Sequence, residues 1–171
     1  MIIPDFLRPT EAASARLKFL IFTEGTLLGP EHWWDFFFVR RYKPIGCAVK
    51  KINVWVAQGA QVNYLTSRRA KAEVDAVRII LEDAGLGGNH LYYRGRDEDY
   101  HHVAERLNPD VLIEDDCRSI GGSCHWVITH VTPVLKDRIT SIVVPEFGGI
   151  DHLPNKLKEL LNYRSKPTDV S

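Results

Sequence analysis

The chain has 171 residues, and 44% of them are hydrophobic, which is enough to build the core of one domain. The 22 Lys and Arg residues balance the 22 Asp and Glu residues, so the overall charge indicates neither nucleic acid nor an anionic membrane as a partner. Three cysteines, no signal-peptide pattern and no apolar run of membrane-spanning length predict a cytoplasmic protein with reduced thiols.

Residues 1–16 contain two prolines and an Ala-rich run with little periodicity, so we expect an N-terminal extension there. A single domain is predicted over residues 17–162, followed by a C-terminal tail at residues 163–171. The domain opens with an apolar run at residues 19–22, typical of a buried parallel strand, which ends in a Glu-Gly-Thr loop. Because open α/β sheets bind ligands beyond the carboxyl ends of their strands, we expect the chemistry to gather around Glu24.

An aromatic stretch follows at residues 33–38, where five of the six side chains are rings. Two interpretations are open. The stretch is either a helix packed on the core, or an exposed lid or contact surface, since surface aromatic clusters often mark binding sites. The second interpretation allows a partner protein or a homodimer.

Apolar side chains at helical spacing then predict an amphipathic helix between Gly46 and Gly59. A second strand is predicted at residues 61–66, followed by a helix that ends at Gly85 and a short third strand at residues 91–93.

The second half of the chain continues this alternation. Asp97 is predicted to cap a helix that stops before Pro109, and a fourth strand is predicted at residues 111–113. A fifth strand is predicted at residues 139–144, and Pro154 is expected to open a terminal helix. Strands that alternate with helices predict an α/β fold with a mainly parallel sheet covered on both faces.

Residues 66–69, Thr-Ser-Arg-Arg, place hydroxyls and guanidinium groups where the second strand gives way to a helix. Arginine is unfavourable at the positive end of a helix dipole unless an anion binds there. Thr66, Ser67 and Arg68 are therefore candidate phosphate ligands. The alternative is that Thr66 or Ser67 only caps the helix while the arginines face solvent.

Glu114, Asp115 and Asp116 set three carboxylates side by side at the end of the fourth strand. Such crowding is unfavourable unless some of them protonate or a cation binds among them, and oxygen ligands suit Mg²⁺. With Glu24 from the neighbouring strand, Asp115 and Asp116 are candidate magnesium ligands, and Glu114 is a candidate at the rim. The alternative is that Asp116 caps the next segment and Glu114 faces solvent.

Residues 148–152, Gly-Gly-Ile-Asp-His, follow the fifth strand and bring flexible backbone, a carboxylate and an imidazole to the same edge. Asp151 and His152 are further candidates for the rim of the site. The alternative is that the two glycines only form the turn before the terminal helix.

The order of these motifs resembles the haloacid dehalogenase superfamily of phosphohydrolases. The resemblance rests on Glu-Gly-Thr-Leu at residues 24–27, Thr-Ser-Arg at residues 66–68, and the strand with its acidic end at residues 109–116. It implies a Rossmann-like three-layer sandwich with a five-stranded sheet of order 5-4-1-2-3. It also implies a site for Mg²⁺ and phosphate at the strand ends, with Gly25 and Thr26 on the phosphate and no large cap domain.

The chain departs from the family at the nucleophile. The family's first motif reads Asp-x-Asp-Gly-Thr, and aligning it on Gly25 and Thr26 puts Glu24 in place of the second Asp. The first Asp, the nucleophile, becomes Phe22, whose ring cannot attack phosphorus. The best register places Tyr100 where the family has a lysine.

We therefore expect a protein that binds Mg²⁺ and a phosphorylated small molecule but forms no aspartyl-phosphate. If it is a hydrolase, Mg²⁺-bound water attacks directly, with Glu24 as general base and Arg68 or Arg69 offsetting phosphoryl charge. One alternative is a non-catalytic interaction module that uses residues 33–38. The other is a phosphatase in which another carboxylate, such as Asp151, has become the nucleophile.

Overall fold

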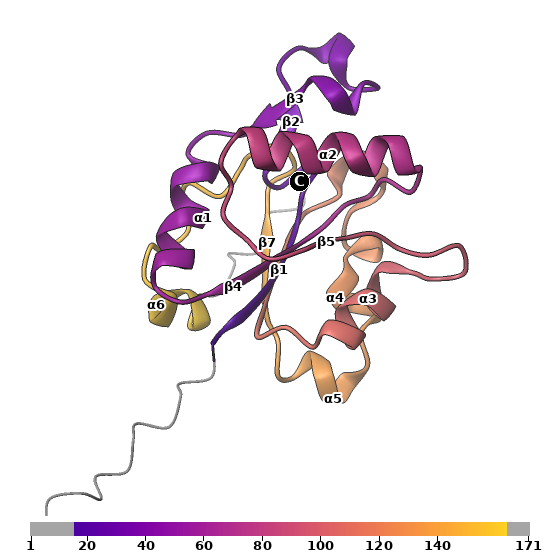
Figure 1. The fold of residues 1–171 in the computed structure, drawn as a ribbon. Coiled ribbons are helices and arrows are strands. Elements are labelled where there is room, and N and C mark those ends of the chain that lie inside the picture. The colour runs from indigo at the N-terminus through magenta and orange to yellow at the C-terminus, as the bar shows by residue number, and fades with distance from the viewer. Residues whose placement is uncertain (1–15, 164–171) are drawn as a thin grey trace, which may run out of the picture.

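The computed structural model describes residues 16–163 (Figure 1). Apart from Arg16 and Tyr163, the expected N-terminal extension and C-terminal tail lie outside these residues. Every pairing in the central sheet is parallel. Its five strands are β1 (Lys18–Phe22), β4 (Gln61–Leu65), β5 (Leu91–Tyr92), β6 (Val111–Asp115) and β7 (Thr140–Val144).

The strand order in this sheet is β5-β4-β1-β6-β7. A separate antiparallel ribbon, formed by β2 (Leu28–Pro30) and β3 (Tyr42–Pro44), was not indicated by the sequence pattern. Because it contains the second and third strands of the chain, the strand numbers in the sheet differ from those expected. When only the five parallel strands are counted, starting from β7, the order reads 5-4-1-2-3. The first strand is therefore central, between β4 and β6.

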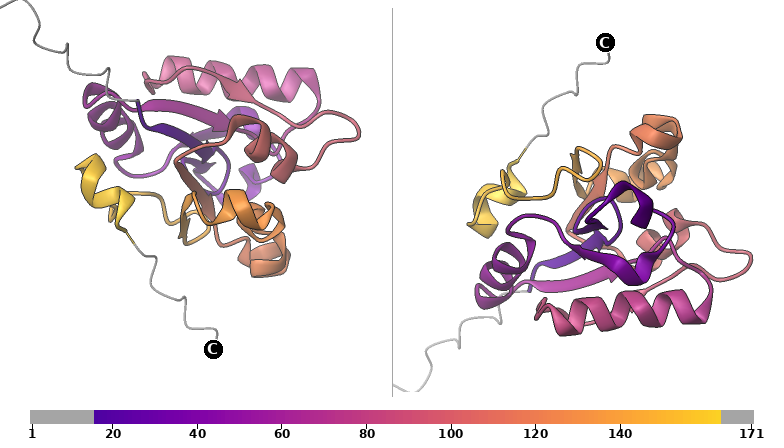
Figure 2. Two further views of the ribbon diagram at one scale, coloured as in Figure 1. Left: turned by 90° about the horizontal axis from the view of Figure 1, so that it is seen from below. Right: turned by 90° about the horizontal axis from the view of Figure 1, so that it is seen from above.

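Helices cover both faces of the sheet. One apolar cluster packs α1 (Ala48–Ala57), α2 (Lys71–Asp83) and α6 (Leu157–Leu161) on one face. A second cluster packs α3 (Tyr100–Leu107), α4 (Val127–His130) and α5 (Pro133–Lys136) on the other. Figure 2 shows the strands running between α2 on one side and the α4–α5 segment on the other. This α/β arrangement is consistent with a Rossmann-like layered fold.

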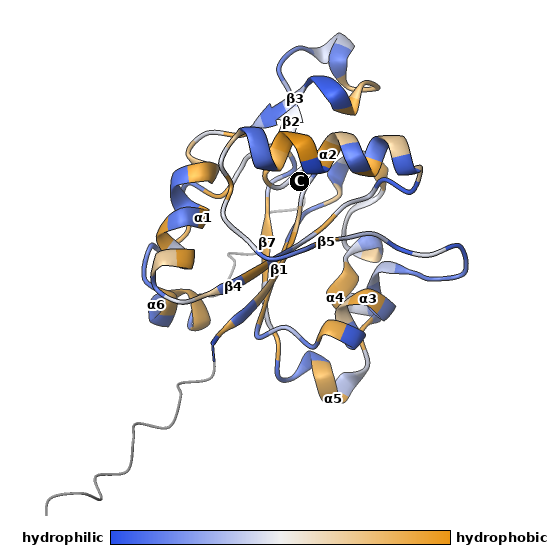
Figure 3. Ribbon diagram, in the orientation of Figure 1, coloured by the Kyte–Doolittle hydropathy of each residue, from blue (hydrophilic) through white to orange (hydrophobic). Residues whose placement is uncertain are grey.

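The sequence pattern accounts for these layers. Along β1, Phe19 and Ile21 belong to the first cluster while Leu20 and Phe22 belong to the second, so the strand is apolar on both faces. Trp55 of α1 is fully buried, with its ring centroid 5.7 Å from that of Phe19. Figure 3 shows hydrophobic and hydrophilic residues alternating along α2, as expected for a helix that buries one stripe.

Short 3₁₀ turns complete the structure. They are η1 (Trp33–Asp35), η2 (Val39–Arg41), η3 (Arg118–Ile120) and η4 (Gly122–His125). No helix within residues 16–163 is both long enough and apolar enough to span a bilayer.

Two predicted helix starts are wrong. Asp99, not Asp97, caps α3, because its side chain and that of His102 form a reciprocal capping box. The terminal helix starts after Lys156 rather than at Pro154. The carbonyl oxygen of Pro154 instead accepts a hydrogen bond from the Trp55 indole at 3.0 Å, so the chain packs on α1 before it becomes helical.

The interpretation of residues 33–38 as a helix packed on the core is also wrong. Trp33 and Phe37 are 82% and 81% exposed, and the segment forms only a 3₁₀ turn beyond the β2–β3 ribbon. Its buried residue is Asp35, whose carboxylate bonds Arg41 at 2.7 Å. This ion pair closes the turn, and the rings of Trp33 and Phe37 face outward.

Candidate functional site

Four loops meet at the carboxyl edge of the sheet. Glu24 follows β1, Thr66 follows β4, Asp115 ends β6, and Glu146 follows β7. The structure joins the first two directly, because the Thr66 hydroxyl donates to Glu24 Oε1 at 2.6 Å. Segments far apart in the sequence therefore deliver polar side chains to one edge, as the parallel strands predict.

A cavity of about 540 Å³ opens at this edge. Of the predicted site residues, the ones that line it are Glu24, Gly25, Ser67, Arg68, Glu114 and Asp115. Those that do not line it are Thr26, Thr66, Asp116, Asp151 and His152.

Glu24 is held in place by its neighbours. Besides Thr66, its carboxylate accepts hydrogen bonds from the Thr23 hydroxyl at 2.8 Å and the Ser67 backbone N–H at 3.0 Å. Arg68 Nε lies 3.8 Å from Glu24 Oε1. Both carboxylate oxygens are thus engaged in linking the β1 and β4 loops, and a role as general base would require breaking one of these bonds.

Thr66 is a linking residue rather than an open phosphate ligand. It is fully buried, its hydroxyl proton is used on Glu24, and its oxygen accepts the Arg68 backbone N–H at 3.1 Å. The helix-capping alternative is wrong, because the N-cap of α2 is Ala70. Ser67 and Arg68 are left facing the cavity from a loop that Glu24 and Thr66 hold.

Asp115 approaches the first loop closely. Gly25 has φ +80°, and a Cβ at this position would lie 2.8 Å from Asp115 Oδ1, so only glycine fits. The carboxylate accepts the Cys117 backbone N–H at 3.1 Å. Burial raises the pKa of Asp115, and the negative charge of Glu146 acts in the same direction.

The neighbouring carboxylates at the end of β6 have different hydrogen-bond partners. Asp116 accepts the backbone N–H groups of Arg118 and Glu146 at 3.3 and 3.1 Å, although the N-cap of η3 is Cys117. Glu114 does not face solvent: it is 2% exposed and accepts N–H bonds from Val127 and Ile128 at the start of α4. Burial raises its pKa from 4.5 to about 7.

The predicted magnesium ligands do not converge. Within residues 16–163, Glu24, Asp115 and Asp116 do not bring three ligand atoms within 4.8 Å of one another. Because Glu24 and Asp116 are engaged elsewhere, Asp115 is the predicted ligand that both lines the cavity and keeps an oxygen with only a 3.5 Å contact, to the Thr26 hydroxyl. Mg²⁺ needs only one or two protein carboxylates, so the residues fit a water-rich ion at Asp115.

The loop at residues 148–152 serves the packing of α1. Asp151 accepts the Cys47 backbone N–H at 2.7 Å, just before this helix, and the His152 ring lies 6.5 Å from that of Tyr163. Since neither side chain lines the cavity, the interpretation of Asp151 as a replacement nucleophile loses its geometric basis.

Phe22 lies on the cavity wall at the end of β1. It is 8% exposed, and its ring meets that of Tyr100 edge to face, with centroids 5.3 Å apart at 74°. Tyr100 is the residue that the family register aligned with the lysine. The residues that the resemblance aligned with the family's nucleophile and with its lysine thus form an aromatic pair in this chain.

Arg94 is a cavity residue that the sequence did not indicate. Its guanidinium carbon lies 4.3 Å from the Tyr100 ring centroid. Both Arg94 and Arg68 have a buried Nε that finds no hydrogen-bond partner among the residues the structure describes. A buried donor without a hydrogen-bond partner costs about 1–3 kcal/mol, which an anion could offset. An anion would share these groups with nearby carboxylates, because Arg68 lies 3.8 Å from Glu24 and Arg94 lies 3.5 Å from Asp99.

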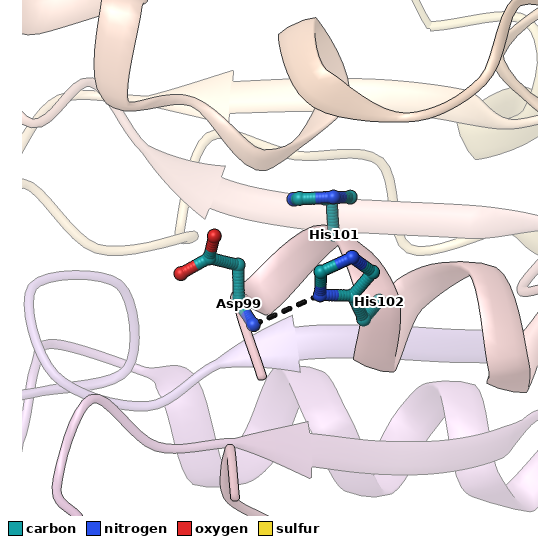
Figure 4. Close-up of side chains that lie close together, drawn as sticks. All are labelled: Asp99, His101 and His102. Carbon is teal, nitrogen blue, oxygen red and sulfur yellow. Dashed lines mark hydrogen bonds between the residues drawn. The ribbon is translucent and has the colours of Figure 1, made fainter. Parts of the chain in front are cut away.

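A second cluster of polar side chains lies at the start of α3 (Figure 4). Ligand atoms of Asp99, His101 and His102 lie within 4.8 Å of one another. However, His102 Nδ1 already accepts the Asp99 backbone N–H at 3.0 Å, and Arg94 lies 3.5 Å from the Asp99 carboxylate. These contacts make the group a helix cap whose imidazole and carboxylate are partly committed.

No protein-family model and no curated protein matches the sequence. Among solved structures, the chain is similar to one chain in the "Structure of Pnkp1/Rnl/Hen1 complex", with a TM-score of 0.55 and 13% sequence identity. The match covers 84% of this chain and 53% of that chain, so this chain spans about half the length of the structure it matches. At this identity the likeness shows the fold alone.

Proposed function

We propose that the protein binds a phosphorylated ligand in the cavity, with the phosphate held by Arg68, Arg94 and the Ser67 hydroxyl. The observation that carries the proposal is the pair of arginines on the wall of one cavity, each with a buried Nε that lacks a hydrogen-bond partner among residues 16–163. A phosphate accepts such donors in charge-assisted bonds, and the guanidinium fork matches its geometry.

The fold supports this assignment. The Rossmann-like layered sheet places the cavity beyond the carboxyl ends of its strands, where open α/β sheets bind ligands. The motif order that resembles the haloacid dehalogenase superfamily suggests the same ligand class. The likeness in fold to a chain of the Pnkp1/Rnl/Hen1 complex is compatible with it.

Mg²⁺ is part of the proposal as a partner of the phosphate. Asp115 would hold it, since this carboxylate faces the cavity and has an oxygen with only one long contact. When bound, the ion would offset negative charge between the carboxylate and the phosphate. It would also lower the pKa of Asp115, which burial raises.

Binding, rather than turnover by the family route, is the proposed activity. Phe22 stands where the family has its nucleophile, and a phenyl ring forms no phospho-intermediate. The Glu24 carboxylate is engaged by hydrogen bonds from Thr66 and Ser67 and by the nearby Arg68 guanidinium group. In this arrangement Glu24 positions the phosphate-binding loop.

A ligand-binding experiment tests the proposal. Phosphate in the presence of Mg²⁺ should raise the melting temperature, because a ligand at 100 times its Kd stabilises the native state by about 2.7 kcal/mol. Arg68→Gln and Arg94→Gln should each remove the shift, whereas Arg40→Gln, which changes an exposed arginine outside the cavity, should keep it. A shift that is absent, or that survives both cavity substitutions, refutes the phosphate site.

The exposed aromatic surface at residues 33–38 favours a second candidate, an interaction module. Five rings there are 41–82% exposed, which is unusual for side chains of this size. If a second copy of the chain covers them, light scattering should show a dimer that Trp33→Asp converts to a monomer. Ile79→Asp, at an exposed apolar position on α2, is the matched control. A wild-type monomer at all concentrations rules out the homodimer.

A further inference from the structure

The walls of the cavity beyond the arginines are aromatic. Rings of Phe22, Phe36, Tyr42, Tyr100 and Phe147 line it. Its volume of about 540 Å³ is far more than a phosphate ion needs and falls within the roughly 300–1,000 Å³ typical of sites for larger organic ligands. We therefore infer that the ligand has an organic part that contacts these rings.

Two of these rings form a corner in the cavity wall. Phe36 and Phe147 meet edge to face, with centroids 5.8 Å apart at 70°, and Phe36 is 41% exposed. A flat ring placed in this corner would stack on one phenyl group and meet the edge of the other, which are the two favoured aromatic arrangements.

Phe147, one of the two rings of this corner, has a strained backbone conformation. Phe147 has φ +58°, in the left-handed region that a bulky side chain rarely adopts. Its N–H donates to the carbonyl oxygen of Gly25 at 2.7 Å, which fixes the loop in this conformation beside the phosphate-binding residues. Strain of this kind persists where the surrounding structure enforces it, and such positions cluster at ligand sites.

The corner lies close to the phosphate site. The Arg68 guanidinium carbon is 6.0 Å from the Tyr42 ring centroid, and the Tyr42 hydroxyl donates to the Phe36 carbonyl oxygen at 2.8 Å. Tyr42 thus lies between the guanidinium group of Arg68 and the backbone of Phe36. A ligand that fills the phosphate site and the corner needs a phosphate and a flat ring joined by a short spacer.

We propose that the ligand is a nucleotide, whose phosphate binds Arg68 and whose base enters the corner of Phe36 and Phe147. This inference rests on the proposed function, because it uses the same phosphate site. The nucleotide is either a free mononucleotide or the terminal residue of a single strand, and both present the same phosphate and base.

Calorimetric titrations with Mg²⁺ present test the base-binding corner. The probes are ribose 5-phosphate, adenosine monophosphate, uridine monophosphate and a short single strand with a 5′-phosphate. Stacking of a base on an aromatic side chain is worth enough for the nucleotides to bind at least about fivefold more tightly than ribose 5-phosphate. Phe36→Ala should remove this advantage and leave ribose 5-phosphate unchanged. Trp33→Ala, which alters an exposed ring outside the cavity, should change neither.

The outcomes separate the two proposals. Equal affinities for ribose 5-phosphate and the nucleotides, or a nucleotide preference that survives Phe36→Ala, overturn the nucleotide while leaving the phosphate site intact. No binding of any probe refutes both. Tighter binding of the strand than of the mononucleotides supports a strand end as the source, and equal binding supports the free nucleotide.

Discussion

The buried carboxyl group of Glu114 makes stability depend on pH in a direction that can be tested. Its pKa is about 7 in the folded protein against an ordinary 4.5, and burial is the main cause. Between these values the native state holds a proton that the unfolded state has released. Stability from this group is therefore fully present below pH 4.5 and is lost as the pH rises through 7.

The size of the effect follows from the two pKa values. Integrated from pH 5 to pH 8, the shift lowers the free energy of unfolding by about 2 kcal/mol. Urea unfolding at both pH values, with a chelator present, measures this loss in the wild type and in Glu114→Gln. The substitution also changes the bonds to Val127 and Ile128, but that cost is the same at each pH and cancels when each protein is compared with itself.

Glu114→Gln should lose about 2 kcal/mol less than the wild type over this range. Groups remote from Glu114 contribute equally in both proteins, so the difference isolates Glu114 together with Asp115, whose charge acts on it. If the two proteins lose the same free energy between pH 5 and pH 8, the raised pKa of Glu114 is refuted.

Three further substitutions test the packing of the site. Gly25→Ala combines φ +80° with a steric clash, so it should cost about 2 kcal/mol or more in thermal unfolding and weaken phosphate binding. Gly59→Ala, at φ +96° with no atom within 4 Å, should cost only about 1 kcal/mol. Thr66→Val should cost about 2 kcal/mol in urea unfolding, because it leaves a Glu24 oxygen unpaired. Lys51→Met should cost a similar amount, because this largely buried ammonium group bonds two oxygens of the chain before α6; an unchanged midpoint would show that these oxygens find water instead.

The parallel sheet was predictable because its strands are continuous apolar runs and its long helices have regular apolar spacing. The β2–β3 ribbon was not, since strands of three residues such as Leu28–Pro30 carry no measurable periodicity. The exposure of residues 33–38 was misjudged by one interpretation because aromatic content alone does not reveal which side the chain turns outward. Asp35, the residue that is buried there, looked like an ordinary polar position.

For the site, sequence order predicted one common pocket for Glu24, Thr66 and Asp115. The structure brings them to one edge of the sheet, because the carboxyl ends of parallel strands share an edge, but Thr66 does not line the cavity. The sequence could not show that Glu24 and Thr66 form a hydrogen bond with each other, a contact that engages both side chains within the protein. Arg94 stands in a charged loop with no motif, so only the folded chain reveals its stacking on Tyr100.

The phenyl ring of Phe22 bears on how a bound ligand leaves the cavity. An enzyme releases a product, whereas the cavity, under the proposed function, releases the same ligand that it bound. Its occupancy then follows the concentration of free ligand in the surroundings. If the proposed function holds, the site responds to the ligand's concentration as a receptor does and does not deplete the ligand.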